Sequence, residues 1–266
     1  FNTISTNGEL RFRDDAIKIQ SSADGQLDID ADTEIEITTT TVDLNGALTI
    51  SGDTTLEDGA DLITASAGTS NVRIGVNAGN SIQSGGNYNV VVGDEAGTAL
   101  TTGDNNTAIG YQALSTEDAH GTNTAIGYQS LKTLNAGADA YNIAIGYNAG
   151  SLITTGVQNT IIGGLSADAM TEGTRNVAVG LASMGADTKS SKNVAIGHGT
   201  LASQNNTSAT DSNNVAVGYE AGNDITTGIQ NTILGALAGD ALTDADRNTV
   251  LGFQALTTDT QGSRTV

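Results

Sequence analysis

The chain lacks cysteine, proline and tryptophan altogether, and it has few aromatic residues of any kind. Without cysteine there is no disulfide, no thiolate nucleophile and no zinc site built on cysteine. Aromatic residues make up 3% of the 266 residues, whereas a globular domain of this length normally buries many large aromatic side chains. The composition therefore favours a stack of repeats, packed from small and β-branched side chains, over a single rounded core.

Positive charge is also scarce, because 10 Lys and Arg stand against 30 Asp and Glu and give a formal net charge of −20. Phosphate recognition needs the opposite sign, so we expect no nucleic-acid partner. No run of about 18 apolar residues is present, so we expect no insertion into a membrane. No signal peptide is visible. The first residue is Phe1, and we expect the sequence to be a segment of a longer protein.

Glycine is abundant, and much of it recurs at a regular interval. A unit of Asn, two small or β-branched residues, a large aliphatic residue and Gly occurs eleven times, with successive glycines 17 to 21 residues apart. The repeat glycines are Gly75, Gly93, Gly110, Gly127, Gly146, Gly163, Gly180, Gly197, Gly218, Gly235 and Gly252. An Asn stands four residues before each of them, from Asn71 to Asn248. Repeats in fixed register predict stacked coils.

A longer period lies over the short one. Residues 147–184 resemble residues 219–256 at an offset of 72 residues, which is four short units. Duplication of a four-coil block is the simplest origin of this second period.

Each unit has the alternation of a short strand, as in the segment from Asn176 to Gly180. Stacking predicts that Ala108, Ala125 and Ala144 form one column, and that Ile109, Ile126 and Ile145 form another on the opposite face. Glycine ends the strand because positive φ costs it little, and Asn is expected at the other corner, where stacked amides can form a ladder. A small residue three positions after each glycine predicts a second short strand that faces the first.

One coil of about 17 residues has a thin core. One face of its strand can fill the interior, and the other face needs a partner, for which an identical chain is the simplest candidate. We therefore expect a homo-oligomer.

The units at 123–130 and 193–197 resemble the head repeats of trimeric autotransporter adhesins, and phage tail fibres and related virion fibres carry similar repeats. The resemblance covers about 71–256 and implies a homotrimer of left-handed parallel β-rolls. The adhesin repeats are shorter than 17 residues, so longer loops are expected here. The predicted fold is thus all-β: a left-handed parallel β-roll, or solenoid, of about eleven 17-residue coils over residues 71–266.

Residues 1–57 lack this register and alternate apolar with polar residues, as in Leu10-Arg-Phe12, Ile17-Lys-Ile19 and Leu27-Asp-Ile29. This pattern predicts short strands and resembles the intertwined β shaft of viral and phage fibres. Residues 58–70 are interpreted as a transition. At the other end, Arg264-Thr265-Val266 resembles the start of another unit, so we expect the repeats to continue beyond residue 266.

Few residues are candidates for chemistry. Asp28, Asp30 and Asp32 match the opening of a calcium loop, but the later ligand positions hold threonine, and alternation places the three carboxylates on a solvated strand face. We expect no metal and no cofactor. Carboxylate pairs such as Asp94 and Glu95 stand in turns, and no phosphate loop or nucleophile elbow occurs. The chain is therefore not expected to be an enzyme.

The two histidines are His120 and His198. His198 follows a repeat glycine, where other copies have Tyr, so we interpret it as a corner residue. Two histidines without further ligands do not make a zinc site.

Tyrosine follows three consecutive repeat glycines, at Tyr111, Tyr128 and Tyr147. We predict that these rings form a ladder. Two interpretations stay open: packing between coils or subunits, or a strip on which sugar rings stack.

The two longest repeats predict two surface loops, at 204–212 and 132–140, because extra residues cannot enter a stacked strand without breaking its register. Asn205, Asn206 and Thr207, together with the tyrosine ladder, are the candidate surface contacts. Trimming residues 205–209 is expected to leave stability nearly unchanged.

These features favour a structural protein: a section of a homotrimeric phage tail fibre that supports host-cell attachment and receptor binding. Its expected partners are copies of itself, other tail or fibre proteins, and a host receptor such as a polysaccharide, and its expected location is the virion tail. Two alternatives stay open: the head of a bacterial trimeric adhesin at the cell surface, and a polysaccharide depolymerase on a β scaffold.

Overall fold

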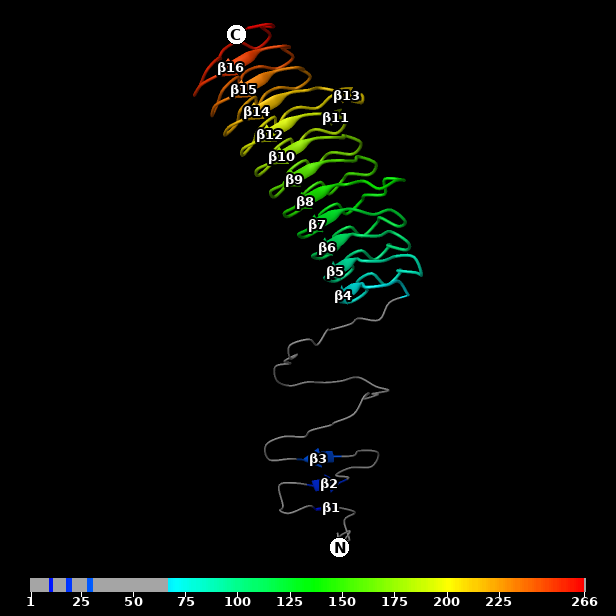
Figure 1. Cartoon of the computed structure of the whole chain (residues 1–266). Coiled ribbons are helices and arrows are strands. Elements are labelled where there is room, and N and C mark those ends of the chain that lie inside the picture. The colour runs from blue at the N-terminus through cyan, green and yellow to red at the C-terminus, as the bar shows by residue number, and fades with distance from the viewer. Residues whose placement is uncertain (1–9, 12–17, 21–27, 31–66, 266) are drawn as a thin grey trace. The chain divides into compact units, whose positions relative to one another are not determined.

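The computed structural model describes residues 10–11, 18–20, 28–30 and 67–265 (Figure 1). Within these residues every regular element is a β-strand and no helix occurs. The chain divides into two compact units, Phe1–Ala60 and Asp61–Val266, which are described separately.

The N-terminal unit contains three short antiparallel strands in the order β1 (Leu10–Arg11), β2 (Lys18–Gln20) and β3 (Asp28–Asp30). Ile19 pairs with Leu10 on one side and with Ile29 on the other. Strands are confirmed at these three alternating segments. The other alternating segments, Asp32 and residues 58–66 of the predicted transition lie outside the described residues.

The second unit is a parallel β-solenoid of eleven coils, as predicted (Figure 1). One strand from each coil joins an 11-stranded parallel sheet. Its strands are β4 (Val72–Ile74), β5 (Val90–Val92), β6 (Thr107–Ile109), β7 (Thr124–Ile126), β8 (Ile143–Ile145), β9 (Thr160–Ile162), β10 (Val177–Val179), β12 (Val194–Ile196), β14 (Val215–Val217), β15 (Thr232–Leu234) and β16 (Thr249–Leu251). A smaller parallel pair, β11 (Ser190–Ser191) and β13 (Thr210–Asp211), joins two coils beside the main sheet.

The middle residue of each strand points into the coil, and the first and third point outward. Ala108 pairs with Ala125, and Ala125 with Ala144, so the predicted alanine column is confirmed. All three alanines are fully buried. Ile109 and Ile126 pair in the same way on the outer face.

The asparagines form a buried ladder along one corner. In each step the backbone N–H of one Asn donates to the side-chain Oδ1 of the Asn before it, as from Asn106 to Asn89 at 2.9 Å and from Asn176 to Asn159 at 2.9 Å. The repeat glycines have positive φ, as predicted. The left-handed residue at the other corner precedes Asn, however: Gln158 has φ 61° and Arg175 has φ 57°.

The predicted second strand is wrong. The small residues three positions after each glycine lie in turns, because left-handed residues flank them: Gln112 has φ 53° and Leu114 has φ 52°, on either side of Ala113. The small residues are nevertheless buried against the sheet. Ser130 donates its hydroxyl to the carbonyl of Ala144 at 2.8 Å.

The coils are of two types, distinguished by the residues four and seven positions after the repeat glycine, which we call position 4 and position 7. Type 1 coils have Gly or Ala at position 4 and a large apolar residue at position 7. These pairs are Gly79 and Ile82, Gly97 and Leu100, Gly150 and Ile153, Ala167 and Met170, Gly222 and Ile225, and Gly239 and Leu242. Type 2 coils instead have Leu or Met at position 4. These pairs are Leu114 and Glu117, Leu131 and Leu134, Met184 and Asp187, Leu201 and Gln204, and Leu256 and Asp259.

Two coils of type 1 are followed by two of type 2 throughout the solenoid, which is the structural meaning of the 72-residue period. In type 2 coils the large position 4 side chain fills the interior, so position 7 can be polar. Glu117, Asp187 and Gln204 are all fully buried there. The two long loops both belong to the second type 2 coil of a pair.

Candidate functional site

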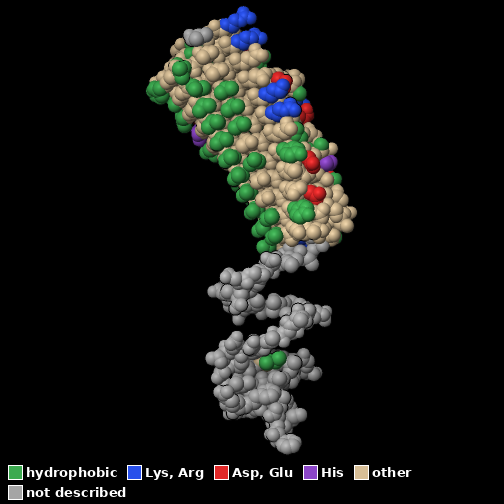
Figure 2. Space-filling model, viewed as in Figure 1, with side chains coloured by type: hydrophobic (Ala, Val, Ile, Leu, Met, Phe, Trp, Pro, Cys, Tyr) green, Lys and Arg blue, Asp and Glu red, His purple; other side chains and the backbone are tan. Residues whose placement is uncertain are grey.

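The outer face of the 11-stranded sheet is a distinctive surface of the solenoid. The first and third residues of every strand are Val, Ile, Leu or Thr, so the two columns contain no charge. Many of these side chains are only half buried, and Ile143, Ile162, Ile196 and Leu234 expose 37–40% of their surface. Figure 2 shows hydrophobic side chains in continuous columns along one side of the solenoid.

The predicted tyrosine ladder borders this face. The rings of Tyr111 and Tyr128 lie 5.4 Å apart at an angle of 23°, and those of Tyr128 and Tyr147 lie 5.2 Å apart at 11°. The three side chains are 39%, 42% and 56% exposed. Since the rings stack on one another, their outer edges and hydroxyl groups face solvent.

A polar ladder runs beside the tyrosines, and it escaped the sequence analysis. The amide of Gln129 donates to Gln112 Oε1 at 2.8 Å, and the amide of Gln112 donates to Glu95 Oε2 at 2.5 Å. The signal was present in the sequence, because these residues stand 17 positions apart, each two residues after a repeat glycine. The two ladders together offer aromatic edges, hydroxyl groups and amides along one line.

The surroundings of the first tyrosine of the ladder favour its neutral form. Partial burial, and then the negative charge of Glu95, raise the pKa of Tyr111 above its ordinary value. Tyr111 can therefore act as a hydrogen-bonding phenol.

A second, shorter stack occurs further along the solenoid. The rings of His198 and Tyr219 lie 5.3 Å apart at 11°, which confirms His198 as a corner residue. The first ladder ends at Tyr147 because the next coil has Gly164 in the corresponding position.

The predicted surface loop at 204–212 is only partly a loop, because Thr210–Asp211 form strand β13 and Gln204 and Ser212 are buried. Residues 207–209 are exposed, and so is Asn205. Asn206 is only 7% exposed, and its amide donates to the hydroxyl groups of Ser190 and Ser212 at 2.9 and 3.0 Å. Of the three loop candidates, Asn205 and Thr207 can meet a partner, whereas Asn206 holds the loop in place.

One group of side chains could offer ligands to a metal ion among the described residues: Glu117, Asp118 and His120, whose ligand atoms lie within 4.8 Å of one another. Glu117 already accepts hydrogen bonds from the backbone N–H of His120 and of Ala136, both at 3.3 Å. Burial raises the pKa of Glu117, while these hydrogen bonds oppose the shift. The carboxylate therefore serves the packing of the neighbouring coil.

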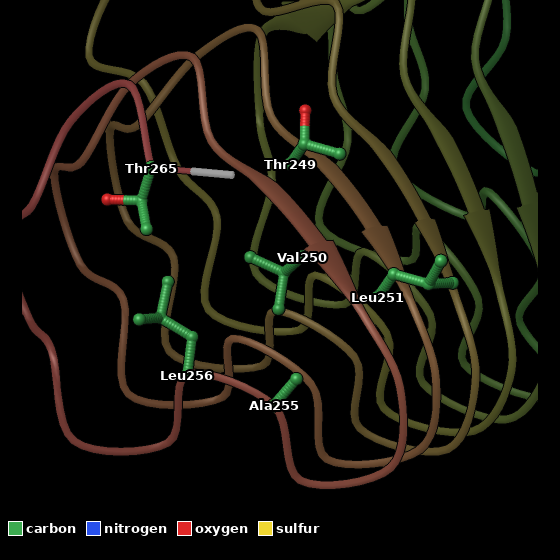
Figure 3. Close-up of a pocket in the computed structure, with 6 residues that line it drawn as sticks. All are labelled: Thr249, Val250, Leu251, Ala255, Leu256 and Thr265. Carbon is green, nitrogen blue, oxygen red and sulfur yellow. The ribbon is translucent and has the colours of Figure 1, made fainter.

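An apolar hollow lies at the last described coil (Figure 3). Val250, Ala255 and Leu256 point into the interior of this coil, and Thr249, Leu251 and Thr265 complete the lining. No titratable side chain lines the hollow. In the preceding coils the corresponding surface is covered by the coil that follows.

Comparison with known proteins identifies no relative: no protein family, no curated protein and no solved structure matches the chain. The described residues include no helix long and apolar enough to cross a membrane.

Proposed function

We propose that the chain is a section of a homotrimeric fibre of the kind found in phage tails, and that it supports attachment to a host cell. The observation that carries this proposal is the uncharged outer face of the main sheet. Exposed apolar surfaces of this extent mark sites of association. A second and a third copy in register would bring equivalent columns together along the whole solenoid, because all copies share one repeat.

The number three comes from the resemblance to trimeric adhesin heads and fibres. The observations favour association through the columns of Ile126 and Ile145, because the first and third residues of the eleven strands carry no charge.

Sedimentation of the full chain tests this proposal. We expect a mass of three chains for the parent protein and a smaller species for Ile126→Asp, since a carboxylate in the column would be desolvated on association. Thr207→Asp, at the exposed loop tip, is the matched control and should sediment like the parent. A parent protein that is folded and entirely monomeric would contradict the proposal.

Attachment would use the surfaces that the trimer leaves free. The tyrosine ladder and the exposed loop residues Asn205 and Thr207 are the candidate contacts, and a host polysaccharide is the candidate receptor. Other tail or fibre proteins would join the segment at its ends, on the virion tail.

Binding of labelled protein to a panel of bacterial strains, with their purified surface polysaccharides as competitors, tests attachment. Tyr128→Ala should weaken binding while the oligomer mass stays unchanged. Tyr88→Ala, an exposed tyrosine outside the ladder, is the control. If Tyr128→Ala changes the mass instead, the ladder packs between subunits.

The two alternatives predict different results. The head of a bacterial adhesin has the same solenoid, and it would be identified by a heptad stalk and a membrane anchor encoded in the same gene. A depolymerase would shorten a bound polysaccharide, which gel filtration of the incubated glycan detects.

A further inference from the structure

Three fully buried polar atoms in neighbouring coils have no hydrogen-bond partner: Asp187 Oδ2, Asn193 Nδ2 and Gln204 Nε2. The two other such atoms among the described residues, on Asn148 and Asp240, belong to residues that are partly exposed. Buried polar groups are nearly always bonded to protein or to ordered water. Three unpartnered atoms in adjoining coils therefore call for one explanation.

The long loop accounts for the unpartnered amide of Asn193. The side-chain amide of a ladder Asn normally donates to the backbone carbonyl 14 residues further on, as Asn176 does to Ser190 at 2.8 Å. The coil that follows Asn193 carries extra residues, so the residue 14 positions on is Thr207, at the exposed loop tip. Asn193 has therefore lost its usual acceptor.

Register brings Asn193 and Asp187 together. The Asn176 amide lies 3.7 Å from the sulfur of Met170, which occupies position 7 of its coil and stands six residues earlier. Asp187 also occupies position 7 and stands six residues before Asn193. The Asp187 side chain therefore occupies the coil position that Met170 occupies one coil before.

Gln204 occupies position 7 of the next coil, directly in register with Asp187. The residues that follow the two are in contact, because the hydroxyl of Thr188 donates to Asn205 Oδ1 at 2.7 Å. By register, the three side chains therefore lie on the same side of the interior in these two adjoining coils.

The other halves of these side chains are already fixed. Asp187 Oδ1 accepts the backbone N–H of Ser190 at 2.9 Å, and Gln204 Oε1 accepts the amide of Asn214 at 3.1 Å. These bonds orient each side chain, and they do not involve Asp187 Oδ2 or Gln204 Nε2. Burial raises the pKa of Asp187, and the Ser190 hydroxyl also lies close enough to this carboxylate to oppose that larger effect.

We propose that one internal water molecule binds between Asp187, Asn193 and Gln204. Its oxygen would accept from the two amide groups and donate one O–H to Asp187 Oδ2, which satisfies all three atoms at once. A cation would leave both amide donors unsatisfied, and an anion would be repelled by the negative charge of the Asp187 carboxylate. Water is the ligand whose hydrogen bonding matches this set.

The corresponding pair of coils, four coils earlier in the chain, contains Glu117 and Leu134, and its hydrogen bonds differ from those at Asp187 and Gln204. Glu117 is one methylene longer than Asp187, and its Oε2 accepts the N–H of Ala136 from the other long loop at 3.3 Å. Asn123 donates to the carbonyl of Gly121 at 3.1 Å, and Leu134 stands where Gln204 would. No unpartnered buried atom remains there among the described residues, so no water is required.

This water would connect the loop at 204–212 to the preceding coil, and the inference does not depend on the proposed function. A crystal structure of the full chain at high resolution tests it directly. We expect density about 2.7–3.2 Å from all three atoms. A direct bond from Gln204 Nε2 to Asp187 Oδ2 without density would overturn the proposal, as would a cation with contacts of about 2.4 Å.

A solution measurement gives an independent result. Oxygen-17 magnetic relaxation dispersion counts long-lived internal waters, and Gln204→Leu, which copies Leu134, should lower the count by one per chain. Gln158→Leu, an exposed glutamine, is the control and should leave the count unchanged. An unchanged count in Gln204→Leu would contradict the proposal. If this variant does not fold, the crystal structure of the parent protein still decides whether the water is present.

Discussion

Gly150 and Ile153 share one space in the core of the solenoid. A Cβ atom built on Gly150 would lie 2.9 Å from Ile153 Cδ1, which is too close for two carbon atoms. The same relationship links Gly97 to Leu100, at 2.8 Å. In these type 1 coils a side chain at position 4 would therefore meet the large residue at position 7, whereas the type 2 coil with Leu131 and Leu134 buries both side chains.

Gly150→Ala should lower the free energy of unfolding by roughly 2 kcal/mol, because the new methyl group overpacks the core and Ala is strained at positive φ. Gly150 has φ 57°. Denaturant unfolding measures the change.

A double variant shows whether the loss arises from the shared space. Ile153→Val removes one methyl group, so the double variant Gly150→Ala/Ile153→Val should be more stable than the sum of the single losses predicts. If the stability losses of the two single variants add strictly, the loss in Gly150→Ala arises from backbone strain alone.

The sequence predicted the parallel stack, the outward and inward columns and the tyrosine ladder, because each is a consequence of register alone. Once Tyr111, Tyr128 and Tyr147 occupy the same place in successive coils, about 4.8 Å of strand spacing brings their rings together. A residue type that recurs at the same position of successive coils therefore forms a column in the structure.

The turn after the repeat glycine could not be predicted in the same way. Ala113 has the size of a strand residue, but its neighbours Gln112 and Leu114 adopt left-handed backbone, which residue type alone does not indicate for Leu. The burial of Asn206 was also hidden, because its partners Ser190 and Ser212 lie on different coils and are ordinary surface residues by composition.

The asparagine ladder should contribute more to stability than any exposed polar residue. Asn159→Ala removes the acceptor of the Asn176 N–H and the donor to the Gly173 carbonyl, both buried. We expect a loss of about 2–4 kcal/mol, because buried groups are left unsatisfied. Thermal and denaturant unfolding measure it, and Gln158→Ala, next to it but exposed, should change stability little.

Stability should fall as the pH rises from acid toward neutral, in part because of Glu117. Burial raises its pKa above the ordinary value of 4.5, so the folded state favours the protonated form. The contribution is fully present below pH 4.5 and is lost as the pH rises through the raised pKa. A protonated His120 opposes the shift, since it stabilises the carboxylate.

Glu117→Gln should flatten this part of the pH profile, because Gln cannot ionise. The measurement is the melting temperature from pH 4 to pH 8, compared with the parent and with Asp224→Asn, an exposed carboxylate. If Glu117→Gln keeps the parent's full pH dependence, Glu117 is not a source of it.

The long loop at 204–212 should tolerate change only at its tip. Removing residues 205–209 would also remove Asn206, which is buried and bonded to Ser190 and Ser212. From the structure we therefore expect this deletion to lower stability, whereas the sequence alone predicted a neutral change. Replacing residues 207–209 with Gly-Ser-Gly should leave the melting temperature nearly unchanged, because these residues are exposed.

Asn206→Ala should lower the free energy of unfolding by about 1–3 kcal/mol, since two buried hydroxyl groups lose a donor. If the tip replacement is the more damaging of the two, the loop is held by its tip, and Asn205 and Thr207 are then structural residues rather than free contacts.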